Sequence, residues 1–274
     1  MPEGHSIHRL ARRLTAVFAG TRTEVTSPQG RFAASAALLD GRVFERAWAH
    51  GKLLFLVIGG RTVHVHLGLI GKFDVTPAAG GIEPPVTGIV RLRIRNEQYA
   101  ADLRGPMVCR IVEPPEIDDL IARQGADPLP PGTDPSPAWT KLQRSTKSIG
   151  ELLMDQSVIA GVGNIYRCEV LYRQRIGPAY AGKRIKRASF DAIWADLVRL
   201  MNVGVHTGRI ITVEDDVIAA ERDIAAGNLK VEYDRPNYVY QHAGEACGRC
   251  GATIRMRQLA GRKLYWCGGC QRRT

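Results

Sequence analysis

Two groups of residues in this sequence have types and spacings that could do chemistry, and they stand at opposite ends of the chain. At the start, Met1 is followed by Pro2, Glu3 and a glycine. Small residues after an initiator methionine usually let an aminopeptidase remove it, which would leave Pro2 with a free secondary amine and Glu3 beside it. An α-amine titrates near pH ~8, so a fraction of it is unprotonated and nucleophilic at neutral pH.

The other end carries four cysteines with the spacing C-x2-C-x16-C-x2-C, namely Cys247, Cys250, Cys267 and Cys270. Each C-x2-C is a tight turn that places two thiolates about 2.3 Å from one Zn²⁺. Four thiolates complete a tetrahedron, so the pattern predicts one structural zinc ion per chain and no open position for catalysis. The alternative, two redox pairs, is disfavoured because two evenly spaced pairs are present.

The 274 residues carry a formal net charge of +11, which favours a polyanionic partner. From position 247 to the last residue, 274, there are seven basic residues and no acidic one. A module without a carboxylate is better explained by phosphate contact than by solvation alone. No apolar run approaches the roughly 20 residues that span a bilayer, and the start lacks the apolar region of a secretory signal. We therefore expect no membrane partner and a cytoplasmic, nucleoid-associated protein.

The first part of the chain predicts one helix followed by strands. Apolar residues recur at helical spacing from Ile7 to Phe18, Gly20 stops the pattern, and Pro2 stands where the first turn of a helix accepts proline. The amine of Pro2 would thus stand at the positive end of a helix. Strand-like runs follow at Arg42–His50, Lys52–Ile58, Thr62–Leu67, Ile89–Arg95, Gln98–Leu103 and Met107–Val112. This order is typical of a β-sandwich with a terminal helix.

The second part of the chain predicts helices, with candidates at Ile149–Met154, Ile165–Arg173 and Ser189–Val205. A short helical stretch is expected around Ile117–Arg123, residues 208–237 have mixed signals and could hold a mobile loop, and the terminal segment should form a β-hairpin around the metal. The fold class is α+β. The predicted domains are 1–115 (catalytic β-sandwich), 116–137 (linker), 138–240 (helical) and 241–274 (zinc ribbon).

A glycine-rich turn, Gly161-Val162-Gly163-Asn164, joins two of the helical patterns. Backbone N–H groups at such a helix start can hold a phosphate, and Asn164 adds a side-chain donor. A plain turn in which Asn164 only caps the helix is the common alternative. His64 and His66 alternate on a strand and are interpreted as hydrogen-bonded structural residues.

Together these motifs resemble the formamidopyrimidine-DNA glycosylase and endonuclease VIII family of bifunctional DNA repair enzymes. The resemblance rests on the Pro-Glu-Gly start, His50-Gly51-Lys52, His66-Leu67-Gly68-Leu69, Asp127-Pro128-Leu129, the turn ending Gly163-Asn164-Ile165-Tyr166, and the terminal cysteines. It runs the whole length of the chain in order. It implies an N-terminal β-sandwich, a helix–two-turns–helix domain, a zinc ribbon, and damaged double-stranded DNA bound by a monomer.

The resemblance also implies roles for single residues. Pro2 would be the nucleophile, Glu3 the general acid/base, and Lys52 a catalytic-site lysine that approaches a phosphate beside the lesion. Asn164 and Arg262 would contact the phosphates that flank the flipped nucleotide. Without the resemblance, Lys52 would be an exposed strand lysine and Arg262 a solvated hairpin residue.

Two positions concern the choice of lesion. Where formamidopyrimidine-type members carry Arg-Arg-Phe-Gly, the corresponding stretch of this chain is Asp102-Leu103-Arg104-Gly105-Pro106, so Arg104 is the arginine kept for DNA contact and the aromatic is lost. This change and the Pro-Glu-Gly start are closer to endonuclease VIII and favour oxidised pyrimidines. Leu69 stands where the family inserts an apolar wedge into the base stack, and a core leucine is the alternative reading.

The sequence therefore predicts a DNA N-glycosylase that also has abasic-site lyase activity, works through a Schiff base at the terminal proline and cleaves the strand by β,δ-elimination. Two alternatives remain open. One is a protein of the same fold that only incises abasic sites, and the other is a zinc-ribbon protein that binds DNA without cutting it.

Overall fold

The computed structural model describes residues 2–78, 82, 84–228 and 237–272, and the contacts within it define two compact units. Unit 1 comprises Met1–Ala122 and unit 2 comprises Arg123–Thr274. Within the described ranges, none of the helices has the length and apolar character that crossing a membrane requires.

The predicted N-terminal helix is confirmed as α1 (Gly4–Phe18). Its buried face repeats every three or four residues, as the sequence pattern required, through Ile7, Ala11, Leu14 and Phe18. The helix stops before Gly20, which adopts a left-handed backbone conformation at φ 79°.

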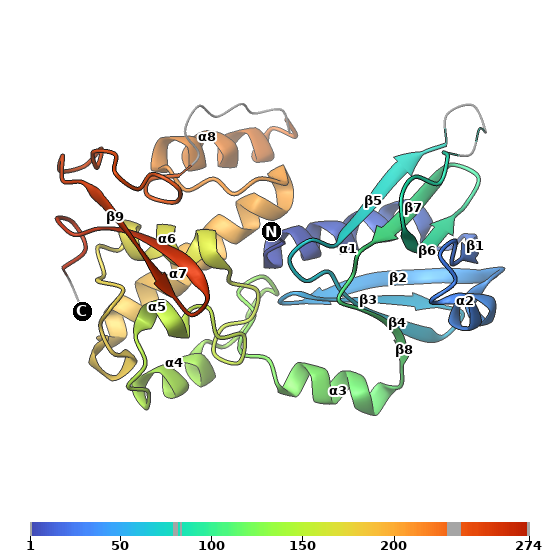
Figure 1. The fold of residues 1–274 in the computed structure, drawn as a ribbon, viewed down its shortest axis with the longest axis horizontal. Coiled ribbons are helices and arrows are strands. Elements are labelled where there is room, and N and C mark those ends of the chain that lie inside the picture. The colour runs from blue at the N-terminus through green and yellow to red at the C-terminus, as the bar shows by residue number, and fades with distance from the viewer. Residues whose placement is uncertain (1, 79–81, 83, 229–236, 273–274) are drawn as a thin grey trace. The chain divides into compact units, whose positions relative to one another are not determined.

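The described part of unit 1 contains an eight-stranded antiparallel sheet (Figure 1). Its strands are β1 (Arg22–Thr26), β2 (Arg42–His50), β3 (Leu53–Ile58), β4 (Arg61–His66), β5 (Lys72–Pro77), β6 (Val90–Arg95), β7 (Tyr99–Arg104) and β8 (Val108–Val112). Their order is β5-β7-β6-β1-β2-β3-β4-β8. Strand β1 joins the two halves, because its first two residues pair with β2 and its last three with β6.

One hydrophobic core lies between the two halves of this sheet. Phe44 and Leu56 come from the β2–β3 side, whereas Leu92 and Leu103 come from the β6–β7 side, and all four are fully buried in the same cluster. Apolar residues of α1 complete it. The predicted α+β fold class with a β-sandwich and a terminal helix is confirmed.

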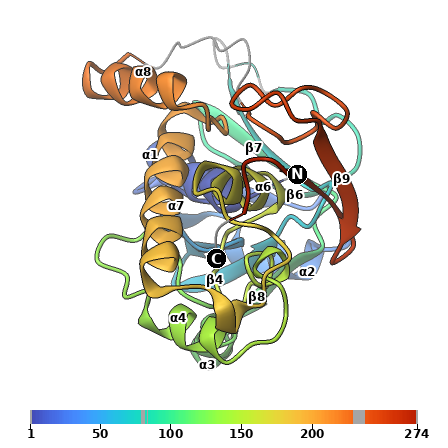
Figure 2. The same cartoon turned by 90° about the vertical axis from the view of Figure 1, so that its left-hand side faces the viewer.

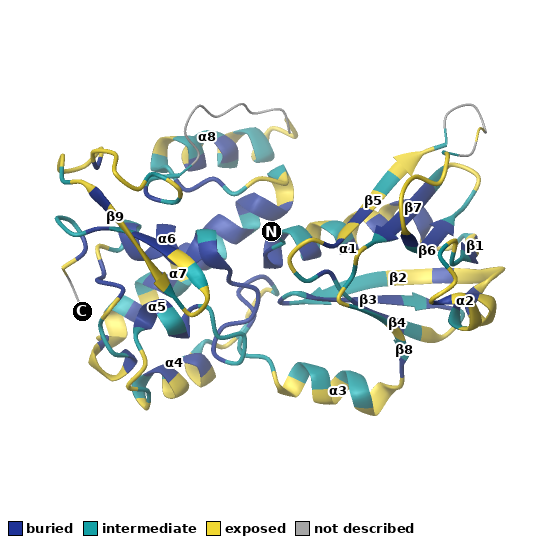
Figure 3. Cartoon of the chain, in the orientation of Figure 1, coloured by how far each residue is buried: buried dark blue, intermediate teal, exposed yellow. Residues whose placement is uncertain are grey.

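The strand-rich reading of residues 21–112 missed three elements, namely β1, β5 and the helix α2 (Ala33–Leu39). The α2 segment is alanine-rich and only seven residues long, so it lacks the two turns of apolar repeat that reveal a helix. The helix expected around Ile117–Arg123 is α3 (Pro114–Ala122), which has no buried residue (Figure 3).

Unit 2 is helical up to its terminal hairpin. It contains α4 (Ser136–Gln143), α5 (Ile149–Leu152), α6 (Asn164–Arg173), a 3-10 turn (Gly182–Arg184), α7 (Arg187–Thr207), α8 (Glu214–Ala225), β9 (Ile254–Leu259) and β10 (Arg262–Cys267). The three predicted helices and the hairpin are confirmed, whereas α4 and α8 were not predicted. The helix α8 occupies part of the predicted loop, and residues 229–236 of that loop lie outside the described residues.

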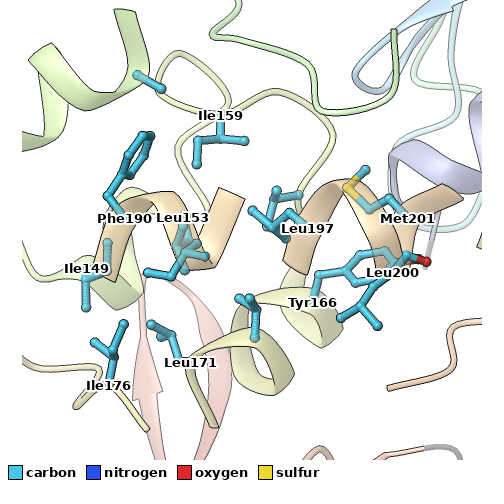
Figure 4. Packing of buried hydrophobic residues seen from close by; sticks show 14 of the residues in the cluster. Ile149, Leu153, Ile159, Tyr166, Leu171, Ile176, Phe190, Leu197, Leu200 and Met201 are labelled. Carbon is cyan, nitrogen blue, oxygen red and sulfur yellow. The ribbon is translucent and has the colours of Figure 1, made fainter. Parts of the chain in front are cut away.

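Helix α6 lies between α7 and the hairpin (Figure 2). Toward α7 it presents Tyr166 and Leu171, which pack in one cluster with Leu197 and Leu200 (Figure 4). Toward the hairpin it presents Cys168 and Tyr172, which belong to a second buried cluster with residues of β10. A helix that is apolar on both sides is buried on both sides, and α6 is therefore the central element of unit 2.

A buried carboxylate fixes the chain that leads into the hairpin. Glu169 on α6 is fully buried and accepts the backbone N–H groups of Tyr238, Val239 and Tyr240 at 2.7 to 2.8 Å. Its Oε2 also accepts the hydroxyl of Thr212 at 2.6 Å. Four donors compensate the desolvation of one carboxylate, so the segment 238–240 is held firmly to α6.

The expectation that His64 is hydrogen-bonded is wrong. His64 is buried on β4, its ring stacks on Phe55 with 5.2 Å between centroids, and neither ring nitrogen has a hydrogen-bond partner among the described residues. The sequence pattern placed His64 on a strand but could not show what surrounds its ring. Burial, with the positive charges of His66 and Arg110 adding to it, lowers the pKa of His64 to about 4.

The low pKa of His64 predicts acid sensitivity. In the unfolded chain a histidine binds a proton near pH 6.5, while in the folded protein His64 stays neutral until about pH 4. The unfolded state therefore binds more protons in this window, and the free energy of unfolding should fall as the pH drops from 6.5 to 4. Urea denaturation at several pH values should show that the free energy of unfolding falls less steeply with decreasing pH in His64→Gln than in the wild type. The same dependence on pH in both proteins would contradict the low pKa of His64.

Candidate functional site

The N-terminal pair stands at the start of α1. Pro2 is half-buried, and Glu3 is fully buried and forms the N-cap of the helix. The carbonyl oxygen of Glu3 accepts the backbone N–H of Ser6 at 2.9 Å and its hydroxyl at 2.8 Å. This backbone anchor holds both residues at the positive end of the helix dipole, where a negative charge on a ligand is stabilised.

Lys52 is the second residue of the turn between β2 and β3. This turn lies at the same end of unit 1 as the start of α1 (Figure 1). Gly51 makes the turn with a left-handed φ of 55°. Burial and the charge of Lys52 both lower the pKa of His66, so Lys52 lies near the end of β4. The Nδ1 atom of His66 accepts the N–H of Gly68 at 3.1 Å, which leaves the proton of a neutral ring on Nε2.

The turn after β4 exposes two large apolar side chains. Leu69 is 51% exposed and Ile70 is 83% exposed. The alternative reading of Leu69 as a core leucine is therefore wrong, and its role as a wedge stays a prediction. Ile70 was not predicted to be exposed, and the structure adds it to Leu69 as a second exposed apolar side chain of this turn.

Arg104, at the end of β7, is held by its own unit. Its guanidinium donates to Asp74 at 3.0 Å, to Asp102 at 2.8 Å, and to both the carbonyl and the hydroxyl of Thr87. These bonds use four of the five N–H donors that a guanidinium has. The contact to DNA assigned to Arg104 stays a prediction.

In unit 2, the glycine-rich turn is fixed by Gln156. Its amide donates to the carbonyl oxygens of Met154 and Val162, and it accepts the N–H of Gly161 at 3.0 Å. Gly163 is the N-cap of α6, and Asn164 is the first helical residue. The alternative in which Asn164 only caps the helix is wrong.

Asn164 instead connects α6 to the hairpin. Its Nδ2 donates to the carbonyl oxygen of Lys263 at 2.9 Å, and its Oδ1 accepts from Arg167. Lys263 is adjacent to Arg262, the half-buried first residue of β10. The structure thus brings together Asn164 and Arg262, the two residues to which the resemblance assigns phosphate contact, although they are 98 positions apart.

The tip of the hairpin is a two-residue turn. Leu259 pairs with Arg262 in register, and the residues between them, Ala260 and Gly261, have φ values of 51° and 71°. Two consecutive left-handed residues define the type I′ geometry that fits the twist of a hairpin. Arg262 therefore begins its strand from a rigid turn.

The four predicted cysteines converge on one point. Their Sγ atoms all lie within 4.8 Å of one another, with Cys247 and Cys270 3.8 Å apart and Cys250 and Cys267 3.5 Å apart. Tetrahedral Zn–S bonds of about 2.3 Å require neighbouring sulfurs about 3.8 Å apart, so the set fits one structural zinc ion.

The zinc site is attached to α6 as well as to the hairpin. The hydroxyl of Tyr172 lies 3.2 Å from Cys247 Sγ, and the guanidinium of Arg249 lies 4.6 Å from the centre of the Tyr172 ring. A hydroxyl donor stabilises a thiolate ligand, as groups around a metal site commonly do. At Gly269 a Cβ atom would come within 2.8 Å of Cys250 Sγ, so glycine is required there.

Sequence reasoning missed Arg167, which contacts both Asn164 and the hairpin. It is fully buried, whereas an arginine in a helix is ordinarily expected to face solvent. The available signal was its spacing of three residues from Asn164, which places both side chains on one face of a helix.

Comparison with known proteins gives three family-model matches that together cover most of the chain. Residues 1–106 match the formamidopyrimidine-DNA glycosylase N-terminal domain, and residues 124–215 match the formamidopyrimidine-DNA glycosylase H2TH domain. Residues 244–273 match the zinc finger found in FPG and IleRS. The last match contains all four cysteines of the zinc site.

Two curated relatives align over nearly their whole length. The chain is 49% identical over 275 residues to Endonuclease 8 1 of Mycobacterium tuberculosis, covering 99% of this chain and 100% of that protein. It is 28% identical to the formamidopyrimidine-DNA glycosylase of Geobacter sulfurreducens, covering 98% of this chain and 96% of that protein. The higher identity is to the endonuclease 8 type.

A solved structure shows the same fold. The wild-type Fpg (MutM) of Lactococcus lactis, in a complex with DNA that contains an oxidised pyrimidine, superposes with a TM-score of 0.79 at 22% identity. The match covers 99% of this chain and 100% of that one.

From the geometry of the zinc site we expect that a variant which loses the metal also loses the folded hairpin. Cys267→Ser removes one of four thiolates, and because the binding free energy of a structural zinc is also folding free energy, the hairpin should unfold. Elemental analysis should find about one zinc per wild-type chain, as expected of a four-thiolate site, and much less in the variant. Cys109→Ser, which lies outside the site, is the control and should keep its zinc. Full zinc content in Cys267→Ser would refute the four-thiolate site.

Proposed function

Because this chain belongs to the formamidopyrimidine-DNA glycosylase and endonuclease VIII family, we propose that it is a bifunctional DNA glycosylase and abasic-site lyase of base excision repair. Its substrate would be double-stranded DNA that contains an oxidised base. The observation that carries the proposal is the start of α1, where Pro2 is followed by a fully buried Glu3 at the positive end of a helix.

Pro2 would supply the nucleophile once Met1 has been removed; Met1 itself lies outside the described residues. The amine attacks C1′ of the damaged nucleotide, the bond from C1′ to the base breaks, and the base leaves with a proton. The sugar then opens to an imine. Because proline is a secondary amine, this imine is an iminium that cannot neutralise itself by losing an N–H proton, and it stays a cationic electron sink.

Glu3 would transfer the protons that this sequence needs. It can protonate the sugar ring oxygen as the ring opens and later accept a proton, as a general acid/base does. The iminium acidifies the 2′ proton. Its removal expels the 3′ phosphate, and a second elimination expels the 5′ phosphate, so the strand is cut on both sides.

The other site residues would bind and deform the DNA. Lys52, Asn164 and Arg262 would contact phosphates, since each offers donors and two of them carry a positive charge. Support comes from the hydrogen bond that links Asn164 to the residue after Arg262. The exposed Leu69 would enter the base stack as the damaged nucleotide is flipped out.

Oxidised pyrimidines are the favoured lesions. The stretch Asp102-Leu103-Arg104-Gly105-Pro106 stands where formamidopyrimidine-type members carry Arg-Arg-Phe-Gly, and the guanidinium of Arg104 is engaged by two carboxylates. The 49% identity to an endonuclease 8 relative, against 28% to a formamidopyrimidine-DNA glycosylase, supports the same preference.

Borohydride trapping across a panel of lesion duplexes tests the proposal. Reduction of the iminium should give a covalent adduct between Pro2 and the DNA, located by mass spectrometry of the N-terminal peptide. Protein that keeps Met1 or an N-terminal tag should bind the duplex without forming the adduct, since its first amine is not that of proline. Pro2→Gly should be impaired yet keep some lyase activity, because glycine offers a primary amine.

Each alternative function has its own outcome in this experiment. Abasic DNA that is cleaved while every oxidised base survives would select a lyase-only enzyme. Intact lesion and abasic duplexes without any adduct would select a non-catalytic DNA-binding protein. If a protein whose N-terminal tag is shown to be intact turns over normally, the nucleophile is not Pro2, and Lys52 is the first residue to examine.

Glu3→Gln tests the proton transfer separately. The amide keeps the size of the side chain but cannot exchange a proton, so base excision in single turnover should fall by about 10²–10⁴-fold. Affinity for a non-cleavable duplex should change much less. An unchanged excision rate would remove Glu3 from the mechanism.

A further inference from the structure

Arg167 is a fully buried arginine on α6. It donates from Nη2 to Asn164 Oδ1, and from Nη1 to the carbonyl oxygens of Gly150 and Leu259 at 3.3 and 3.4 Å. These three acceptors lie on α5, α6 and β9, so Arg167 links three elements of unit 2. Taking an arginine out of water is costly, and these hydrogen bonds offset part of that cost.

The position of Arg167 in the helix is also unfavourable for stability. Asn164 is the first residue of α6, so Arg167 lies only three positions further along, near the positive end of the helix dipole. An anion that binds outside the helix start is attracted both by the positive end of the helix dipole and by the charge of Arg167, because the first N–H groups and a nearby cation attract the same charge. The placement therefore suits a phosphate site at the start of α6.

Arg167 and Asn164 together hold the hairpin tip from both of its strands. Arg167 donates to the carbonyl of Leu259 at the end of β9, and Asn164 donates to the carbonyl of Lys263 at the beginning of β10. Arg262 pairs with Leu259 and directly precedes Lys263. Its backbone is thus fixed from two sides by adjacent donors of α6.

The same contacts orient the amide of Asn164. A guanidinium can only donate, so the amide atom that faces Arg167 must be the oxygen Oδ1. The Nδ2 group is thereby turned toward the hairpin, where one of its two N–H groups meets the carbonyl of Lys263. A rotated amide would place donors against donors, and Arg167 prevents this rotation.

We propose that Arg167 is a positioning residue for DNA binding, which fixes Asn164 and Arg262 relative to each other so that both meet phosphates of one strand. The inference rests on the proposed function of these two residues. Arg167 does not itself touch the substrate. It orients the amide of Asn164, holds the backbone beside Arg262 and adds positive potential at the start of α6.

The test uses the full-length protein and a duplex that contains tetrahydrofuran, an abasic-site analogue with no base to excise. Arg167→Met keeps the length of the side chain but removes its charge and donors. Its affinity for the duplex should fall about tenfold or more, as expected when a charge-assisted hydrogen bond is removed. The log–log salt slope should become shallower by about 0.9 for each phosphate that the protein no longer neutralises. Arg222→Met, which removes an exposed charge on α8, is the control and should change the affinity and the salt slope much less.

A double-mutant cycle separates positioning from a general structural effect. If Arg167 acts through Asn164, then Arg167→Met should cost much less affinity in an Asn164→Ala background than in the wild type. Additive costs would overturn the inference. Zinc content and melting temperature are measured for each variant. If Arg167→Met does not fold, the cycle is run with Arg167→Lys, which keeps the charge but cannot reach all three oxygens and should show the same non-additivity.

Failure of the inference and failure of the proposed phosphate binding give different results. If Asn164→Ala and Arg262→Ala both weaken binding and Arg167→Met does not, only the positioning role is refuted. If Asn164→Ala and Arg262→Ala keep wild-type affinity and salt slope, the proposed phosphate binding by these residues is refuted, and the positioning role with it.

Discussion

The buried carboxylate of Glu169 is the interaction on which the arrangement of unit 2 depends. Three consecutive backbone N–H groups and one hydroxyl converge on it, so the segment 238–240 is held against α6. From there the hairpin and the zinc site follow, and Tyr172 reaches Cys247 from the same helix. Loss of the carboxylate would leave these donors buried without an acceptor, which is far more costly than loss of one exposed hydrogen bond.

The two units divide the work in the proposed function. Unit 1 would hold the groups that make and break bonds, since Pro2 and Glu3 immediately precede α1. Unit 2 holds Asn164 and Arg262, which would contact phosphates. A zinc ion bound by its four cysteines has four thiolate ligands and therefore no free position for a substrate. In the proposed function the metal therefore supplies structure rather than reactivity, since it would hold the hairpin that carries Arg262.

Local pattern predicted much of this molecule. The apolar repeat of α1 and the cysteine spacing each require only neighbouring residues to be interpreted, and both are confirmed. Features that depend on distant partners were not predictable. The burial of Arg167 depends on carbonyls of Gly150 and Leu259, and the isolation of His64 depends on strands β3 and β8 beside it. The short helix α2 was not predicted for a different reason, because seven residues are too few to show a helical repeat of apolar residues.

The type I′ turn at Ala260 and Gly261 has a consequence for the thermodynamics of recognition. A flexible loop that carried Arg262 would have to lose its conformational freedom when it met a ligand, and that loss would weaken binding. Here the backbone is ordered beforehand by the hairpin and by the metal, so this entropy is lost when the protein folds around zinc. In the proposed function, the free energy of metal coordination would in this way be converted into affinity at a site that the metal never touches.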